Sequence, residues 1–254
     1  MSTPLLEARS LVKHYGSVEA LRGASFEVAA GEVVSLIGDN GAGKSTFIKC
    51  LSGAEQPDSG EILLEGKPIH LDSPTTARSL GIETVYQDLA VAPDLDPAAN
   101  LYLGREIKRG GILGALGMLD KKEMRRRASE EFARLGVTLQ NVDVPIGALS
   151  GGQRQSVAVA RSVVWASKVV FMDEPTAALG VVQRERVLDV IRKVRDAGIG
   201  VVLISHNMPE VLSVSDRVEV LRLGKRVARF TAGDASLEDL VGAMTGALVQ
   251  EDVS

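Results

Sequence analysis

One segment constrains the fold of this chain more than any other: Gly38-Asp39-Asn40-Gly41-Ala42-Gly43-Lys44-Ser45-Thr46, which has the spacing Gly-x-x-x-x-Gly-Lys-Ser. The apolar run at 33–37 precedes it and predicts a buried strand. The run at 47–51 carries apolar residues at helical spacing, and Gly53 ends it. Strand, loop and helix in this order are the setting that a phosphate-binding loop, or P-loop, requires. A glycine-rich turn without a ligand is the alternative, and the flanking segments argue against it.

The residue types of the loop suit phosphate chemically. Glycines allow positive φ and bring backbone N–H groups against phosphate oxygens, while the helix that follows points its positive end at the same anion. We expect Lys44 to neutralise β- and γ-phosphate groups and the Ser45 hydroxyl to hold Mg²⁺. The loop therefore predicts a nucleotide-phosphate site.

Composition narrows the class of protein. A chain of 254 residues buries about 70% or more of its unfolded surface, so a true core is expected. The net charge of −4 and the lack of a long Lys/Arg block argue against nucleic acid as a partner. Cys50 is the single cysteine, which excludes an intrachain disulfide and indicates a reducing compartment; we expect it to be a small buried side chain. No stretch approaches the ~18 to 20 apolar residues of a membrane helix, so the expected location is the cytosol or a membrane surface reached by docking.

Apolar strands and helical segments alternate along the chain, without internal repeats. Strands are expected at 6–14, 24–29, 33–37, 60–64, 67–71, 82–86, 169–172, 201–205, 217–223 and 226–230, and helices at 75–80, 119–135 and 183–197. Strands separated by helices predict an α/β fold with a mostly parallel sheet, whose ligand loops lie at the carboxyl ends of the strands. After the last hairpin we expect only a weakly patterned polar tail.

The character of the sequence changes after residue 88, where prolines and glycines interrupt the strands. Glycines at 110–117 predict a loose loop, and the helix at 119–135 follows. One face of that helix is apolar, and its basic residues lie largely off that face, which indicates a solvated surface. We therefore predict a single domain whose core spans 1–88 and 164–246, with a helical subdomain at 89–163 and a tail at 247–254.

Two adjacent carboxylates, Asp173 and Glu174, end the apolar run at 169–172. In this position Asp173 can reach Mg²⁺ or its waters, and Glu174 can orient or deprotonate an attacking water. Solvated acids, or Asp173 as the cap of the next helix, are the alternatives. The P-loop upstream favours the catalytic interpretation.

A second segment that suits phosphate binding is Leu149-Ser150-Gly151-Gly152-Gln153. Ser150 is placed as the N-cap of a helix with an apolar stripe behind it. Capping alone explains Ser150 but not two consecutive glycines, which expose backbone N–H groups at a helix N-terminus and suit a second anion contact.

These motifs, in this order and spacing, resemble the nucleotide-binding subunit of ABC transporters over essentially the whole chain. The resemblance also covers Gln87 after one strand and His206 after another. It implies a P-loop NTPase (RecA-like) core with N-terminal antiparallel strands and an inserted α-helical subdomain. ATP and Mg²⁺ are the implied cofactors, and ATP hydrolysis is the implied activity.

The resemblance further implies roles for three single residues. Gln87 is the hinge glutamine that reaches Mg²⁺ or the water, His206 contacts the γ-phosphate, and Tyr15 stacks on adenine. Taken alone, Gln87 is a polar residue after a strand, a lone histidine is more often structural, and Tyr15 can pack locally. Those alternatives stay open on the sequence.

A partner chain is also implied. Ser150, Gly152 and Gln153 are expected to face the ATP held by the P-loop of a second copy, in an ATP-dependent head-to-tail homodimer. One departure from the family pattern is Gly180, where an aspartate is usual. It puts communication between the two sites in doubt. Hydrolysis is less affected, because Lys44, Ser45, Asp173, Glu174 and His206 are all present.

The stretches 81–88, 100–106 and 205–208 are similar to single-cassette bacterial importers of simple sugars of the ribose, xylose and fructose type. This implies a transmembrane permease docked near Gln87 and residues 89–105, an extracytoplasmic sugar-binding protein, and a peripheral location on the cytoplasmic side of the membrane. A DNA-repair or translation ATPase is one alternative, without the heptad arms or basic face it would usually carry. A weakly hydrolysing regulatory module marked by Gly180 is the other.

Overall fold

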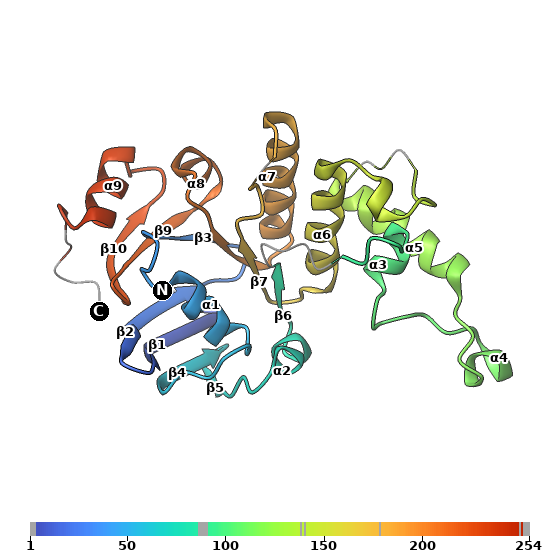
Figure 1. Cartoon of the computed structure of the whole chain (residues 1–254), viewed down its shortest axis with the longest axis horizontal. Coiled ribbons are helices and arrows are strands. Elements are labelled where there is room, and N and C mark those ends of the chain that lie inside the picture. The colour runs from blue at the N-terminus through green and yellow to red at the C-terminus, as the bar shows by residue number, and fades with distance from the viewer. Residues whose placement is uncertain are drawn as a thin grey trace. The chain divides into compact units, whose positions relative to one another are not determined.

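The computed structural model describes residues 4–85, 91–137, 139, 141–177, 179–248 and 250. The chain forms two compact units. The core unit comprises Met1–Gln87, Trp165–Pro175 and Ile191–Ser254, and the helical unit comprises Asp88–Val164 and Thr176–Val190. Figure 1 shows the elements of both units along the chain. Within the described residues, no helix combines the length and apolar content needed to cross a membrane.

An antiparallel sheet of four strands opens the core unit, in the order β2-β1-β4-β5. Its strands are β1 (Leu6–Tyr15), β2 (Val18–Val28), β4 (Ser59–Leu64) and β5 (Lys67–Ile69). The predicted antiparallel N-terminal strands are confirmed, although β2 begins six residues before the expected 24. The register of β1 shifts between Ala8 and Leu11, beside Ser10 at φ 49°. A Cβ on Gly60 of β4 would lie 2.6 Å from the Ser10 carbonyl oxygen, so glycine permits this close approach.

A second sheet of six strands has the order β10-β9-β3-β8-β7-β6. Its strands are β3 (Val33–Ile37), β6 (Ile82–Val85), β7 (Val169–Asp173), β8 (Gly200–Ile204), β9 (Arg217–Arg222) and β10 (Lys225–Thr231). All neighbours pair in parallel except β9 and β10, which form the predicted hairpin. Every residue of β3 and β8 is buried, which explains why all of their residues except Ser35 and Gly200 are large and apolar. The predicted mostly parallel sheet is confirmed.

Among its described residues, the core unit contains four complete helices: α1 (Lys44–Leu51), α2 (Pro74–Ser79), α8 (Met208–Val214) and α9 (Leu237–Thr245). The larger apolar cluster joins the antiparallel strands, α1 and the parallel sheet, and in it the Phe26 and Phe47 rings meet edge to face at 5.8 Å. A smaller cluster lies between β9, β10, α8 and α9. The prediction of an unpatterned tail was wrong for α9. Ser236 and Asp239 form a reciprocal capping box that starts this helix, and Leu240 and Ala243 are buried.

The helical unit contains α3 (Pro97–Leu101), α4 (Gly111–Ala115), α5 (Lys121–Leu135), α6 (Gly151–Trp165) up to Val164, and the first ten residues of α7 (Val181–Asp196). The Asp120 carboxylate accepts a hydrogen bond from the Glu123 N–H and so starts α5. The predicted apolar face is buried, namely Met124, Ala128, Phe132 and Leu135. Its basic residues are exposed, and Arg126 pairs with Glu123 and Glu130, as a solvated surface should. The expected loose glycine loop is instead partly helical, because it contains α4.

Candidate functional site

The P-loop leaves the carboxyl end of β3 and enters α1 at Lys44. Three of its glycines have positive φ: 154° at Gly38, 81° at Gly41 and 103° at Gly43. A Cβ would lie 2.2 Å from the Leu221 carbonyl oxygen at Gly38 and 2.7 Å from the Ala20 carbonyl oxygen at Gly43. Backbone from β9 and β2 therefore presses on the loop, and only glycine fits at these two positions.

The ammonium of Lys44 turns back over this loop. Its Nζ donates hydrogen bonds to the carbonyl oxygens of Gly38 at 2.6 Å and Asp39 at 3.0 Å. Burial lowers the pKa of Lys44, while the carboxylates of Glu174 and Asp173 act to raise it. The cation is thus held where the P-loop and the two carboxylates converge.

A cavity of about 460 Å³ opens beside the loop, a size typical of small-ligand sites. Residues from the P-loop line one side of it, namely Asn40, Gly41, Ala42, Gly43, Lys44, Ser45 and Thr46. Tyr15, Val18 and Leu223 add exposed apolar surface. The Tyr15 hydroxyl donates to the Glu55 carboxylate, and the Lys13 ammonium lies 5.9 Å from the centre of the Tyr15 ring. Tyr15 therefore has local partners and also borders the cavity.

Asp173 and Glu174 lie at the carboxyl end of β7, as the sequence predicts. Burial raises the pKa of Asp173, the nearby Glu174 carboxylate raises it further, and Lys44 opposes both effects. Glu174 has φ 50°, which is uncommon for a residue other than glycine, and its N–H donates to the Ile204 carbonyl oxygen at 2.9 Å. The chain thus turns sharply at Glu174 while staying tied to β8.

His206 lies in the turn between β8 and α8. β7 and β8 pair in parallel with Asp173 opposite Ile204, so the residues after both strands meet at one edge of the sheet. There the His206 Nδ1 lies 2.8 Å from the Glu174 Oε1. The Glu174 side chain is only 15% exposed, whereas His206 is 79% exposed. The sheet therefore joins Glu174 and His206, which are 32 residues apart in sequence.

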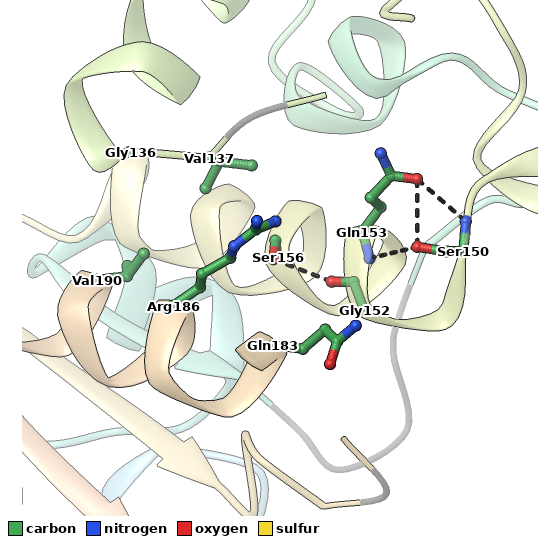
Figure 2. Close-up of a pocket in the computed structure, with 9 residues that line it drawn as sticks. All are labelled: Gly136, Val137, Ser150, Gly152, Gln153, Ser156, Gln183, Arg186 and Val190. Carbon is green, nitrogen blue, oxygen red and sulfur yellow. Dashed lines mark hydrogen bonds between the residues drawn. The ribbon is translucent and has the colours of Figure 1, made fainter. Parts of the chain in front are cut away.

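The second segment predicted to suit phosphate binding, residues 149–153, lies in the helical unit, at the start of α6. Ser150 is its N-cap, as predicted, because its Oγ accepts from the Gln153 N–H at 3.3 Å. The Gln153 Oε1 in turn accepts from the Ser150 N–H and hydroxyl, both at 3.2 Å. Figure 2 shows this reciprocal cap. It leaves Ser150 and Gly151 exposed at the positive end of a 15-residue helix.

Gln183 and Arg186 of α7 border the same element, in a small cavity that the sequence did not point to (Figure 2). A Cβ on Gly152 would lie 2.3 Å from the Gln183 Cγ, so this glycine is needed for close packing of the two helices. Gly180 directly precedes α7, and its carbonyl oxygen accepts from the Arg184 N–H at 3.0 Å. No periodicity marks Gln183, because its contact depends on tertiary packing. The predicted hinge residue Gln87 lies outside the described residues.

Together, the parallel sheet, the glycine-shaped loop and the paired Glu174 and His206 define a P-loop nucleotide-binding domain. Residues 21–177 match the family described as ABC transporter. The chain belongs to the ABC transporter family, and it is an ATPase of the ABC type.

Curated relatives cover nearly the whole chain. Fructose import ATP-binding protein FrcA of Rhizobium meliloti is 53% identical over 246 residues, 96% of this chain and 95% of the relative. Xylose/arabinose import ATP-binding protein XylG of Sulfolobus acidocaldarius is 44% identical over 95% of this chain and 94% of the relative. Ribose import ATP-binding protein RbsA 1 of Rubrobacter xylanophilus is 42% identical over 98% of this chain, which spans 48% of that relative.

Solved structures agree on the fold. A nucleotide-free ATP-binding cassette from an ABC transporter has a TM-score of 0.78 and 27% identity, and the match covers 90% of this chain and 91% of that one. The ADP conformation of another such cassette has a TM-score of 0.79 and 26% identity, over 96% of both chains. The predicted fold class is confirmed.

Proposed function

We propose that this chain hydrolyses ATP to power the import of a simple sugar through a membrane permease. The observation that carries the proposal is the 53% identity to a fructose import ATP-binding protein over 96% of the chain. Relatives named for xylose/arabinose and ribose import support a monosaccharide rather than another class of solute. In this role the chain lies on the cytoplasmic side of the membrane, beneath the permease.

In this proposal the P-loop holds the ATP phosphates. Its backbone N–H groups and Lys44 bind phosphate oxygens, and Tyr15 stacks on the adenine at the edge of the cavity. Oxygen donors from Ser45 and Asp173 suit Mg²⁺, and the raised pKa of Asp173 indicates that a cation would stabilise its charged form. When bound, Mg²⁺ neutralises charge on the β- and γ-phosphates. Gln87 is proposed to reach the metal or the water.

Glu174 is proposed as the base. It takes a proton from a water whose oxygen attacks the γ-phosphorus, and the bond to the bridging oxygen of the β-phosphate breaks. His206 holds this carboxylate through Nδ1. His206 is also proposed to contact the γ-phosphate, because its side chain is exposed beside Glu174.

A second copy of the chain is proposed to supply the contact that closes the ATP site. Ser150, Gly152 and Gln153 stand at the positive end of α6, and Ser150 is exposed. These groups would bind the γ-phosphate on the partner's P-loop in a head-to-tail homodimer. A permease near Gln87 and residues 89–105, and an extracytoplasmic sugar-binding protein, complete the proposed system.

The test is ATP hydrolysis in proteoliposomes that contain the chain together with a sugar permease and its sugar-binding protein. We expect a loaded binding protein to stimulate phosphate release severalfold, and Lys44→Ala to abolish it. Equal rates with and without every monosaccharide tested would contradict the import function. Equal rates for wild type and Lys44→Ala would indicate a regulatory ATP-binding module instead.

A further inference from the structure

In the helical unit, the segment that joins α3 to α5 folds back on itself. Lys108 and Leu119 form an isolated antiparallel bridge at its neck. The Arg109 N–H donates to the Met118 carbonyl oxygen at 2.9 Å, and the Asp120 N–H donates to the Ile107 carbonyl oxygen at 2.7 Å. Residues 110–118 beyond this neck, which include α4, are called the apolar tip. Figure 1 shows α4 at the far end of this segment, away from α3 and α5.

Glycines specify the shape of the apolar tip. A Cβ on Gly114 would lie 1.7 Å from the Arg109 carbonyl oxygen, which no other residue type can accommodate without a backbone shift. Gly111 and Gly117 have φ of 68° and 82°. The turn of α4 is closed by hydrogen bonds from the Leu116 N–H to the Ile112 carbonyl oxygen and from the Met118 N–H to the Leu113 carbonyl oxygen. The apolar tip therefore has a defined backbone conformation, which its glycines and hydrogen bonds determine.

The apolar tip exposes apolar side chains to solvent. Ile112 is 82% exposed and Leu116 is 75% exposed, while Leu113 and Met118 are nearly half exposed. Single exposed apolar residues are ordinary on protein surfaces, but four within seven residues form a patch. A sequence that builds such a turn and leaves it uncovered indicates a surface that binds something.

The charges around the apolar tip are basic. No acidic residue occurs between Ile107 and Leu119, whereas Lys108 and Arg109 are both exposed there, in a chain of net charge −4. Lys121 and Lys122 are exposed on the returning side. The two nearest acids are occupied locally: Glu106 accepts from the Gly104 N–H, and Asp120 caps α5. An anionic surface would complement this arrangement.

We propose that the apolar tip binds the surface of an anionic lipid bilayer. Ile112 and Leu116 would enter the boundary between headgroups and acyl chains, while the basic residues at the neck face lipid phosphates. A protein partner is less suitable, because a stable protein interface buries about 800 Å² per partner with matching shape, and one helical turn offers far less. A bilayer requires no shape match. The purpose of this contact rests on the proposed transport function, but its test needs only the chain itself.

The test is co-flotation of the full chain with vesicles of phosphatidylcholine alone or with one quarter phosphatidylglycerol. We expect binding to the anionic vesicles only. The double variant Ile112→Ser/Leu116→Ser should lower it about tenfold. Lys108→Ser and Arg109→Ser should each lower it about fivefold at low salt. The matched control Val241→Ser, which changes an exposed residue of α9, should bind as wild type does.

Circular dichroism and basal ATP hydrolysis should match wild type for all these variants, because none alters the core or the P-loop. Absent flotation of the wild type, or equal flotation of wild type and the Ile112→Ser/Leu116→Ser variant, would overturn the inference. So would a tip variant that floats normally but loses stimulation by the permease, because that result identifies a protein contact. Failure of sugar stimulation with intact lipid binding would instead count only against the transport function.

Discussion

The carboxylate of Glu174 and the imidazole of His206 are joined by a contact of 2.8 Å between Oε1 and Nδ1. Each residue follows a buried parallel strand, and the pairing of β7 with β8 brings the two together. The contact is solvent-accessible on the His206 side, because that side chain is mostly exposed while Glu174 is largely buried. The proposed base and the histidine beside it are therefore brought together by the sheet itself.

Replacement of Glu174 by glutamine should stop turnover and spare nucleotide binding. The amide keeps an oxygen for His206 but cannot accept the proton of the attacking water, so the rate should fall about 10² to 10⁴-fold. Phosphate release and binding of a fluorescent ATP analogue measure the two properties. Hydrolysis within tenfold of wild type would contradict the assignment of Glu174 as the base.

Replacement of Gly43 by alanine should destabilise the fold by about 2 kcal/mol or more, because the new Cβ meets the Ala20 carbonyl oxygen and φ is positive. Gly41→Ala is the matched control, since φ is also positive there but no atom lies within 4 Å of the added Cβ. It should cost about 1 kcal/mol. Urea unfolding measures both. Equal losses for the two variants would refute the close approach of backbone at Gly43.

Stability should fall above pH 9 through Cys50. Burial raises the pKa of this thiol from 9.0 to about 11. Between these values the unfolded chain releases the thiol proton while the folded chain keeps it, so the stabilising contribution is lost as pH rises. At pH 10 the loss should be about 1 kcal/mol. Cys50→Ala should flatten the slope of unfolding free energy between pH 9 and 10. An unchanged slope would show that the thiol titrates normally in the folded state.

Two inactive variants should complement each other if the site spans two copies. Lys44→Ala damages the P-loop, and Ser150→Arg places a bulky cation at the start of α6. In a head-to-tail mixed dimer, one site combines the intact P-loop with the intact Ser150 segment. The mixture should therefore recover ATP hydrolysis that neither variant shows alone. If the mixture is as inactive as its components, each chain does not depend on the partner's Ser150 segment.

Much of the core unit could be predicted from the sequence, because its signals are local. β3 and β8 are apolar except for Ser35 and Gly200, and the P-loop spacing places Lys44 at the start of α1. Ser150 was identified as a cap because capping joins residues three apart. In each case a short window of sequence contains the physical cause of the structure.

The parts of the fold and of the site that the sequence did not predict depend on tertiary contacts or on short local signals such as a capping box. α9 was not predicted, although Ser236 and Asp239 have the spacing of a capping box and five of its nine residues are apolar, namely Leu237, Leu240, Val241, Ala243 and Met244. α4 was missed because glycines indicate loops, yet here they shape a turn. The distance between Glu174 and His206 follows from strand order, and the packing of Gln183 on Gly152 follows from how α6 and α7 meet. None of these contacts leaves a periodic trace in the sequence.

ATP is proposed to close two copies of this chain around shared sites. Light scattering of Glu174→Gln, with and without ATP and Mg²⁺, tests it most directly, because this variant should bind ATP without consuming it. We predict the chain mass of 26.9 kDa without nucleotide and twice that mass with it. Adding Ser150→Arg should return the ATP-bound sample to the monomer mass. A Glu174→Gln chain that binds ATP and stays at the monomer mass would contradict the claim.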